Sequence, residues 1–356
     1  MTKSKRLNIS NKNKPKNKTK TKTKIKANTI NTRKSKLNTN NNQKLLKINC
    51  NPNNDSVVSR DGTSCLRNSD IVLLVGEFNR FFPKYKIHIT NNDDTTSIFT
   101  KLQKRIAQYS VCRREDCWLG IIDDGLMREK LLSELYGPYQ PNTWNADPNR
   151  WLTNYDIEAV LKQYEDKYPD FKLIGPTSID FNEQHTYLGG CVEEILCNFN
   201  YFRYIEKYPE INKLGIVINY DIHTGPGTHW AAIYIDLKEK LLFHFDSQFG
   251  YQGKLEPQID DFIKIIKKQE PAFNVVINKK THQYSTTECG MYVLYFLITM
   301  LTPNKHSKPK LRSKNNSYDK KIDYFTNKRV HDKDIIYLRD IYFNKDLSNS
   351  DKNIPL

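Results

Sequence analysis

Four residues in the second half of the chain have the types that a thiol needs in order to attack a carbonyl carbon. Cys289 directly precedes a long apolar stretch, so we expect it at the start of a helix, where the helix dipole and free N–H groups favour the thiolate. His229 would take the thiol proton and return it to the leaving amine. Asp246 would orient the imidazole and stabilise its charge. Gln283 and the backbone N–H of Cys289 would donate hydrogen bonds to the oxyanion.

Each of these residues also has a simpler interpretation. A cysteine ahead of an apolar helix is usually a small buried hydrophobe. His229 could be structural, and Asp246 could simply close a strand. The four together indicate a cysteine nucleophile more strongly than any one of them, because Gln283 lies six residues before Cys289 and Asp246 lies seventeen after His229.

A β-hairpin would have to bring the histidine and the carboxylate together. If Asp236 pairs with Leu241 across the short turn between two apolar stretches, the residue facing Asp246 is Ala231. His229 then points to the same face of the sheet as Ala231, because side chains alternate with a period of two. His229 and Asp246 become diagonal neighbours within side-chain reach. A register shifted by one residue would place them on opposite faces.

Apolar periodicity predicts the other elements that position this site. The expected helices are 71–82, 98–109, 153–164, 255–266, 289–301 and 329–343, and the expected strands are 214–219, 228–236, 241–246 and 273–277. Thr153 and Asp156 fit a capping box at the start of their helix. Helices and strands alternate in blocks, which predicts an α+β fold with a mixed central sheet.

Charge is distributed very unevenly along the chain. The whole chain holds 56 Lys+Arg and 40 Asp+Glu, a net charge of +16. Residues 1–54 contain 16 Lys+Arg and no Asp or Glu, which leaves 40 residues of each sign in the rest. This low-complexity segment is expected to be a disordered basic tail. It could tether the protein to nucleic acid without sequence preference, or it could be a solvated tail of a compositionally biased genome.

The composition shifts along the chain predict five segments. They are a disordered Lys/Asn-rich tail over 1–54, a mostly helical N-terminal arm domain over 55–145, a catalytic core over 146–302, a basic linker over 303–321, and a C-terminal helix packed on the core over 322–356. The longest apolar run is far shorter than the roughly 20 residues that cross a bilayer. The N-terminus has no apolar region typical of a secretory signal, so neither a membrane span nor secretion is expected.

The seven cysteines form an odd and scattered set, which predicts reduced thiols and a reducing compartment. Cys112 with Cys117, or Cys191 with Cys197 and His185, could suggest zinc. Their spacings differ from those of zinc ribbons, so no metal is expected. His244 shares a strand face with Asp246 and could compete for its carboxylate, although a solvated neighbour is the simpler interpretation.

The order His229-Trp230, Asp246, then Gln283-x5-Cys289-Gly290 resembles the Ulp1/adenain clan of cysteine proteases. Residues 151–157, Trp-Leu-Thr-Asn-Tyr-Asp-Ile, are similar to the clan's first core helix. Within the clan the chain most resembles the polyprotein-processing proteases of large cytoplasmic DNA viruses, those of the African swine fever virus type, and residues 328–343 fit that type. The Asn/Lys/Ile bias suits a giant virus of the mimivirus kind. The resemblance covers about 145–345 and is specific over 227–297.

The resemblance implies a papain-like core and cleavage after Gly-Gly through a narrow tunnel lined by aromatic rings. Trp151 and Trp230 match the tunnel positions, where two indoles leave room for backbone but not for a β-carbon. In the swine fever type the third triad member is Asn, at a slightly longer spacing from the histidine. Asp246 is expected in that role here, and Gln248 is the alternative if the register shifts. The family gives no reason to expect a metal or an organic cofactor.

The function that follows is that of a thiol endopeptidase that cuts viral structural precursors after Gly-Gly during particle maturation, in the virion and the host cytoplasm. A deconjugase of ubiquitin-like modifiers would use the same triad. A non-enzymatic basic virion protein with a retained protease fold is a third hypothesis. Leu188-Gly189-Gly190-Cys191 could be a self-cleavage site, although a structural turn is the simpler interpretation.

Overall fold

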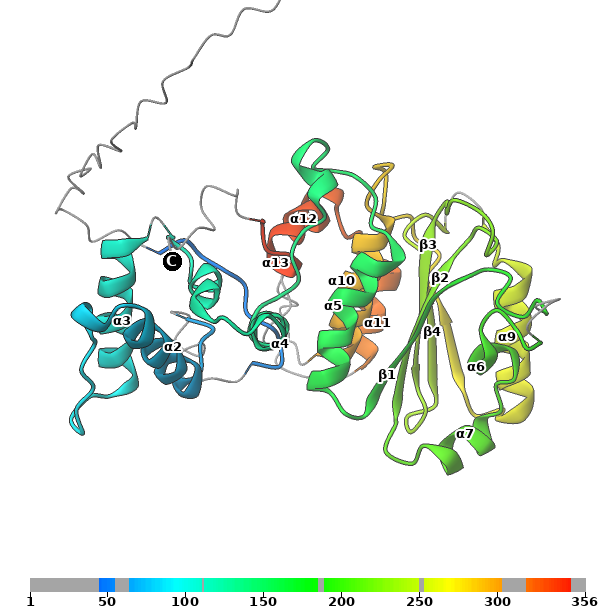
Figure 1. Ribbon diagram of the computed structural model, residues 1–356. Helices are drawn as coiled ribbons and strands as arrows, with labels where there is room; N and C mark the ends of the chain where they lie inside the picture. Colours follow the sequence, from blue (N-terminus) through cyan, green and yellow to red (C-terminus); the bar gives the residue numbers. More distant parts are fainter. Residues whose placement is uncertain are drawn as a thin grey trace, which may run out of the picture. The chain divides into compact units, whose positions relative to one another are not determined.

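The computed structural model describes residues 45–54, 64–110, 112–184, 189–249, 253–302 and 318–346 (Figure 1). Every element below belongs to one compact unit within residues 41–356. Most of the predicted basic tail, residues 1–44, lies outside the described residues. Among the described residues, no helix is both long enough and apolar enough to cross a membrane.

A five-stranded mixed sheet forms the centre of the core. In spatial order its strands are β1 (Phe171–Ser178), β2 (Lys213–Asn219), β3 (Trp230–Asp236), β4 (Leu241–Phe245) and β5 (Asn274–Ile277). β3 is antiparallel to both of its neighbours, β2 and β4. The outer strand β1 pairs in parallel with β2, and the outer strand β5 pairs in parallel with β4. The predicted α+β fold with a mixed sheet is confirmed.

Strand β1 was missed by the sequence analysis. Gly175 and Pro176 interrupt its apolar run, and the pairing with β2 shifts register between Ile174 and Thr177. A proline cannot donate to the ladder and is normally confined to edge strands or bulges. β1 is such an edge strand, so tertiary pairing outweighs the weak local signal.

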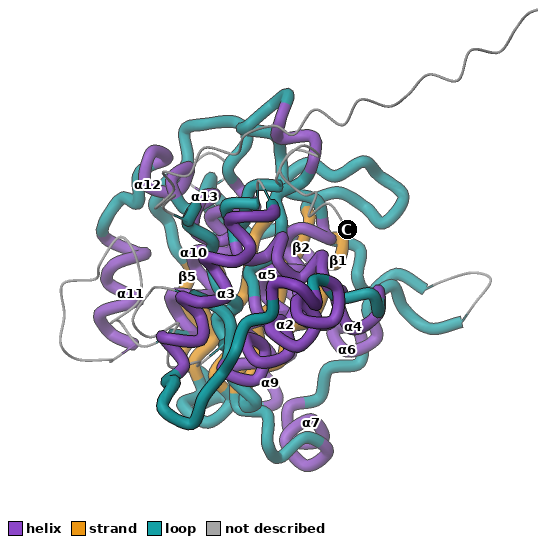
Figure 2. The backbone as a smooth tube through the Cα atoms, turned by 60° about the vertical axis from the view of Figure 1, so that its left-hand side comes forward, coloured by secondary structure: helices purple, strands orange, loops and turns teal. Residues whose placement is uncertain are grey.

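Helices cover both faces of the sheet (Figures 1 and 2). On one face lie α5 (Asn154–Lys167), α10 (Cys289–Leu301) and α11 (Tyr318–Asn327); on the other lie α6 (Glu194–Cys197), α7 (Tyr201–Lys207) and α9 (Pro257–Gln269). Tyr234 and Phe243 pack toward α10, whereas Ile233 and Leu242 pack toward α9. Both faces of β3 and β4 are therefore buried, which explains their nearly continuous apolar sequences.

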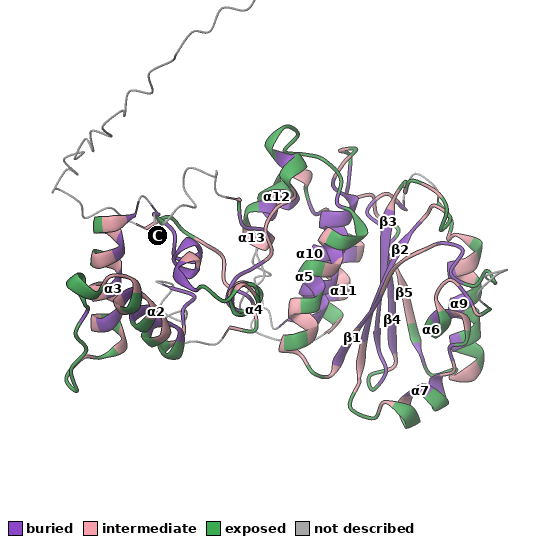
Figure 3. Ribbon diagram, viewed as in Figure 1, coloured by how far each residue is buried: buried purple, intermediate pink, exposed green. Residues whose placement is uncertain are grey.

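Helix α10 is buried along its whole length (Figure 3). A helix that is apolar all round belongs in a protein interior, as its sequence predicted. Helix α5 begins with the predicted capping box, in which the Thr153 N–H donates to Asp156 Oδ2 at 2.8 Å and the Asp156 N–H donates to Thr153 Oγ1 at 3.3 Å. This cap fixes the chain directly after Trp151 and Leu152.

The C-terminal part differs from the single helix predicted over 329–343. It consists of α12 (Asp332–Tyr337) and α13 (Arg339–Tyr342), separated at Leu338. Helix α11 already begins at Tyr318, inside the predicted linker 303–321, of which 303–317 lies outside the described residues.

A buried lysine in α11 ties this helix to the end of α10. Lys321 is buried and donates to the carbonyls of Met300 and Thr302 at 2.8 and 3.0 Å. It thereby satisfies carbonyl groups that the end of α10 leaves without helical partners.

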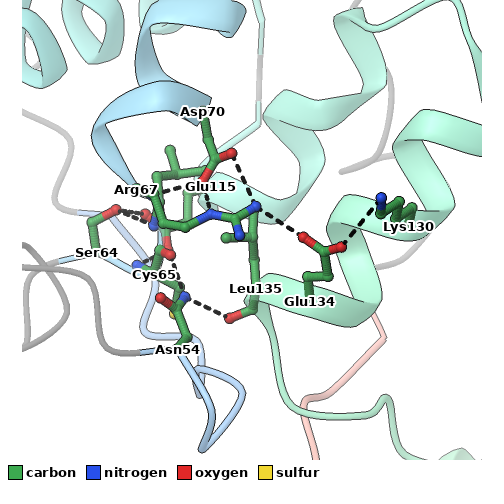
Figure 4. A network of polar contacts seen from close by, with 10 residues as sticks. Asn54, Ser64, Cys65, Arg67, Asp70, Glu115, Lys130, Glu134 and Leu135 are labelled. Atoms are coloured by element: carbon green, nitrogen blue, oxygen red, sulfur yellow. Dashed lines mark hydrogen bonds and ion pairs between the residues drawn. The ribbon is translucent and has the colours of Figure 1, made fainter. Parts of the chain in front are cut away.

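The N-terminal region is helical, as predicted. It contains α2 (Asn68–Phe81), α3 (Thr95–Tyr109) and α4 (Gly125–Leu135), with short 3-10 turns at Pro83–Tyr85, Glu115–Ile121 and Asn142–Asn145. These elements share an apolar cluster of their own. A polar network also ties them together: Arg67 pairs with Asp70 and with Glu134, while Glu115 accepts hydrogen bonds from Ser64 and from the Cys65 backbone (Figure 4).

Residues 45–54, the last part of the predicted tail, run along this region. The Leu46 N–H donates to the Arg113 carbonyl, and the Asn51 N–H donates to the Leu135 carbonyl. Asn49 also exchanges hydrogen bonds with the side chain of Asn344.

The prediction of seven reduced thiols is wrong for six of them. The structure pairs Cys50 with Cys65, Cys112 with Cys117, and Cys191 with Cys197. Local loops bring the Cα atoms of each pair to 5.3, 6.2 and 6.3 Å, within the range that a disulfide spans. Scattered positions in the sequence do not reveal such approaches. Cys289 is the one free cysteine.

Candidate active site

The β3–β4 hairpin has the register that the sequence predicted. Asp236 pairs with Leu241 and Ala232 with Phe245. His229 directly precedes β3 and Asp246 directly follows β4, so both lie at the same end of the hairpin. Nε2 of His229 lies 2.7 Å from Oδ1 of Asp246. The two side chains are 13% and 2% exposed, so their interaction is largely shielded from solvent.

Asp246 is held from three directions. The Tyr220 hydroxyl donates to its Oδ2 at 3.0 Å, and the Gln248 backbone N–H donates to Oδ1 at 2.8 Å. The Asn278 side chain bonds both the backbone N–H and the carbonyl of Asp246, each at 2.8 Å. Burial raises the pKa of Asp246, but the hydrogen bond and the charge of His229 outweigh it and leave the pKa below its ordinary value. The carboxylate is therefore ionised at neutral pH.

Cys289 is the first residue of α10, is 2% exposed and lies close enough to His229 to raise the pKa of that ring. Burial lowers the pKa of His229, but its hydrogen bonds to Asp246 and to Cys289 raise it overall, to about 10. Because Nε2 faces the carboxylate, Nδ1 is the ring nitrogen left for the thiol. A protonated imidazole beside a cysteine favours the thiolate, which is the reactive form.

Gln283 is fully buried beside this group. Its Oε1 accepts from the Ser247 hydroxyl at 2.7 Å, and its Nε2 donates to the Ser285 carbonyl at 2.9 Å. The Gln283 backbone N–H donates to the Ser247 carbonyl at 3.0 Å. Since Ser247 follows Asp246, these bonds join the loop before the cysteine to the end of β4. An amide nitrogen carries two hydrogens, so one remains for a substrate oxygen.

The two tryptophans singled out from the sequence line one open cleft of about 800 Å³. Trp230 is buried and its Nε1 donates to the Leu152 carbonyl at 3.1 Å. Trp151 is 43% exposed and its Nε1 donates to the Thr286 carbonyl at 2.9 Å. The cleft reaches Thr287, two residues before the cysteine. Both indoles are thus held by backbone carbonyls, those of Thr286 and Leu152.

Glycine is required after the cysteine for a packing reason. A Cβ at Gly290 would lie 2.9 Å from Leu152 Cβ, closer than such atoms approach in proteins. The start of α10 can therefore lie directly against the segment that carries Leu152. A side chain at this position would push that segment, and the Trp230 hydrogen bond on it, away from Cys289.

Several alternatives from the sequence analysis are not brought into the site. Gln248 reaches Asp246 through its backbone N–H, not through its amide. Cys191 is bonded to Cys197 and cannot act as a second nucleophile. His185 and Leu188 lie outside the described residues. Within the part of the chain that is described, no group of three or more His, Cys, Asp or Glu residues could hold a metal ion.

Sequence analysis missed Tyr220, which faces His229 across β2 and β3. Its backbone N–H donates to the His229 carbonyl at 2.8 Å, and the two ring centroids are 5.2 Å apart. The pairing of Asn219 with Trp230 produces this arrangement. The register of β2 against β3 would have revealed it, but the long loop between these strands leaves the register undetermined in the sequence.

His244 was expected as a solvated neighbour of Asp246, and this is wrong. It is fully buried, and neither ring nitrogen has a hydrogen-bond partner among the described residues. It pairs with Ile233 across the hairpin and packs on the α9 side of the sheet, near Phe249. Burial lowers its pKa to about 4.

Replacing His244 with leucine should stabilise the protein by about 2 kcal/mol at pH 7, because two unsatisfied polar atoms leave the core. Burial keeps the native pKa near 4, whereas the unfolded chain takes up its proton near pH 6.5. As the pH falls from about 6.5 to about 4, the unfolded chain binds a proton at His244 that the folded protein does not. The native protein should therefore lose about 3 kcal/mol of stability over this range, and the variant should not. Urea unfolding at pH 7 and at pH 4.5 tests this.

His282 serves as the internal control for that experiment. Its pKa is also lowered to about 4, mainly by burial, so it adds the same acid loss to both proteins. Equal pH dependence in the native protein and the His244→Leu variant would contradict the prediction.

Residues 211–338, which contain the histidine, aspartate, glutamine and cysteine of this site, match the Ulp1 protease family, C-terminal catalytic domain. Similar proteins occur in large DNA viruses. The chain is 26% identical over 261 residues to a protein of Acanthamoeba polyphaga mimivirus that is named provisionally as a thiol protease; the match covers 68% of this chain and 82% of the mimivirus protein. It is 26% identical over 236 residues to a cysteine protease of African swine fever virus, covering 59% and 82% of the two chains.

A solved structure shows the same fold. The crystal structure of an African swine fever virus protease superimposes with a TM-score of 0.52 at 19% identity, and the match covers 84% of this chain and 96% of that one. This coverage extends beyond the catalytic domain. At this level of identity the likeness concerns the fold.

Proposed function

We propose that the chain is a cysteine protease of the Ulp1 family, whose catalytic domain matches residues 211–338, and that it cleaves viral structural precursor proteins after Gly-Gly during particle maturation. The observation that carries the proposal is the Asp246–His229 hydrogen bond, with Cys289 raising the pKa of the same ring, next to a cleft that two indoles line and that reaches Thr287. The virion and the host cytoplasm are the proposed locations.

The geometry supports a Cys-His-Asp triad. The Cys289 thiolate attacks the scissile carbonyl, an S–C bond forms, and the carbonyl electron pair moves onto oxygen. The backbone N–H of Cys289 and the second amide hydrogen of Gln283 would stabilise that oxyanion. When the C–N bond breaks, His229 gives its proton to the leaving amine. Water then hydrolyses the thioester with His229 as base, and the thiolate returns. Asp246 keeps the ring oriented and charged throughout.

The indoles of Trp151 and Trp230 support the choice of glycine. Their Nε1–H groups are held by backbone carbonyls, so the rings cannot easily move aside for a bulkier substrate. On this proposal, residues without a β-carbon would pass between the two rings, where an alanine methyl would collide. Glycine is therefore the residue expected at both substrate positions that lie between the rings.

An internally quenched peptide centred on Leu-Xaa-Gly-Gly-Xaa tests the proposal directly. We expect cleavage after the second glycine, identified by mass spectrometry. Matched peptides with alanine in place of either glycine should be cut at least about a hundredfold more slowly, since a clash of one methyl in a rigid site costs about 3 kcal/mol. Equal cleavage of the alanine peptides would contradict the Gly-Gly assignment.

Deconjugation of ubiquitin-like modifiers is the second candidate. It has one specific support: the related protein of three other African swine fever virus isolates is named a SUMO-1 cysteine protease. A folded modifier with a C-terminal Gly-Gly fluorogenic amide distinguishes the two. Processing of the short peptide at a comparable kcat/KM favours the endopeptidase, whereas turnover of the folded modifier alone favours the deconjugase. Failure of both substrates would favour a basic virion protein with an inactive protease fold.

The basic N-terminal segment suggests a partner for this enzyme. With 16 Lys+Arg and no acidic residue over 1–54, it would bind nucleic acid non-specifically and concentrate the protease on packaged genome. Deleting residues 1–44 should abolish duplex DNA binding at physiological salt. DNA binding that survives the deletion would contradict this role.

Replacing Tyr220 with phenylalanine should lower kcat about tenfold, because a hydrogen bond to a charged group contributes about 1.5 kcal/mol or more. The hydroxyl is the donor to Asp246 Oδ2, while the ring that packs on His229 is retained. Peptide kinetics should show the loss in kcat with little change in KM. Tyr234→Phe, which removes another buried hydroxyl from the same sheet, is the control; equal losses in both variants would argue for a general packing effect.

A further inference from the structure

A buried carboxylate directly precedes the nucleophile. Glu288 is fully buried and is the N-cap residue of α10. Its Oε2 lies 3.0 Å from Nη2 and 3.1 Å from Nε of Arg339, and its Oε1 accepts from the Thr287 hydroxyl at 3.0 Å. The side chains of Glu288 and Arg339 are 1% and 6% exposed. The site mechanism described above does not use this pair.

Arg339 is also bonded to the segment that leads to the substrate cleft. Its Nη1 donates to the Arg150 carbonyl at 3.0 Å and its Nη2 to the Asn149 carbonyl at 3.4 Å. Its guanidinium lies over the ring of Trp144 at 4.3 Å. One side chain from α13 therefore joins the start of the nucleophile helix to the residues just before Trp151.

The charge of Glu288 has a consequence for the thiolate. An unpaired carboxylate next to a helix N-terminus would repel an anionic sulfur through a medium of low dielectric constant. It would also cost several kcal/mol by itself, since a buried charge without a partner is strongly unfavourable. The guanidinium of Arg339 removes both penalties.

The other charged groups around the start of α10 are compensated within the site. His229 faces Asp246 at 2.7 Å. Asp332 from α12 accepts from the Tyr292 and Ser285 hydroxyls and pairs with Arg329 at 3.2 Å. Glu288 is thus the carboxylate whose negative charge is balanced by Arg339.

We propose that Arg339 is a positioning residue for the protease reaction: it neutralises Glu288 beside the Cys289 thiolate and anchors the 149–151 wall of the substrate cleft. The inference rests on the proposed nucleophile, but not on the Gly-Gly specificity. The electrostatic part can be read from the thiol itself, and the anchoring part from substrate turnover.

Alkylation of the full chain with iodoacetamide over pH 5–9 measures the electrostatic part. Cys289 is the one free cysteine, so one label per chain reports it. We expect Arg339→Gln to move the acidic limb of the rate profile about one pH unit upward, a tenfold loss of rate on that limb. The double variant Glu288→Gln/Arg339→Gln should return the limb to its native position. Such a return is not expected from a merely structural role.

Arg339→Lys separates anchoring from charge. A lysine keeps the positive charge but cannot reproduce the planar fork that bonds a carboxylate and two carbonyls together. We expect native alkylation and at least about a tenfold lower kcat/KM on peptide. This variant also serves if Arg339→Gln fails to fold.

Three results would overturn the inference: an unchanged limb in folded Arg339→Gln, a double variant no closer to native than the single one, or Arg339→Lys with native peptide turnover. Absence of peptide cleavage by the native chain, together with normal alkylation, would instead count against the proposed substrate.

Discussion

Replacing Cys289 with alanine is expected to abolish peptide cleavage, with a loss in kcat of about 10⁵-fold or more. In the proposed mechanism the sulfur forms the bond to the substrate carbonyl, and no other free thiol can replace it, since the remaining six cysteines are paired. The fold should survive, because removing one buried sulfur atom costs about 1 kcal/mol. Quenched-peptide kinetics and thermal unfolding of the same preparation check both statements.

Two further variants serve as controls for the Cys289→Ala result. Cys289→Ser keeps the shape of the side chain and should be almost as inactive, because a hydroxyl in this setting gives up its proton far less readily than a thiol. The double variant Cys50→Ala/Cys65→Ala removes the disulfide between residues 50 and 65 of the N-terminal region and should retain turnover per folded molecule. Turnover by Cys289→Ala that survives repurification would rule out this nucleophile.

Replacing Asp246 with alanine should lower kcat about a thousandfold, because His229 loses both its orientation and its countercharge. The pKa of the ring, about 10 with the carboxylate in place, should fall toward its ordinary value of about 6.5. The imidazolium of His229 then loses its proton at a lower pH than in the native enzyme, and the imidazolium–thiolate pair is lost with it. The alkaline limb of the kcat/KM profile should accordingly move from above pH 9 toward neutrality.

Asparagine at position 246 separates orientation from charge. Its amide oxygen can still accept from Nε2–H of His229, so part of the activity should remain, but the alkaline limb should still move down. Gln248→Ala is the matched control, since Gln248 reaches the site only through its backbone N–H among the described contacts. A near-native Asp246→Ala enzyme, or a large loss in Gln248→Ala, would transfer the third triad role to Gln248.

Local features of this protein were readable from its sequence because backbone geometry alone determines them. The four-residue turn between the two strands sets the register of β3 and β4, and the period of two then places His229 and Asp246 on one face. Thr153 and Asp156 start α5 because a capping box needs only four adjacent residues. The all-apolar sequence of α10 could lie nowhere but in the interior. The order and spacing of the site residues follow from these elements.

Features that join distant segments were not readable, because each depends on how faces of the fold meet. β1 is a strand because the edge of β2 pairs with it, despite Gly175 and Pro176. The three disulfides depend on loop paths rather than on the spacing of cysteines. Tyr220 reaches Asp246 only through the β2–β3 register.

Arg339 is the clearest case of a role decided by tertiary structure. It lies 51 residues after Glu288 and 189 after Arg150, yet bonds to both. Nothing in its local sequence distinguishes it from the many exposed basic residues of this chain. Sequence alone determined the chemical groups of the site and the hairpin and helix that carry them. The burial, the charge balance and the walls around the nucleophile were decided by tertiary packing, because they arise where segments far apart in the chain exclude water together.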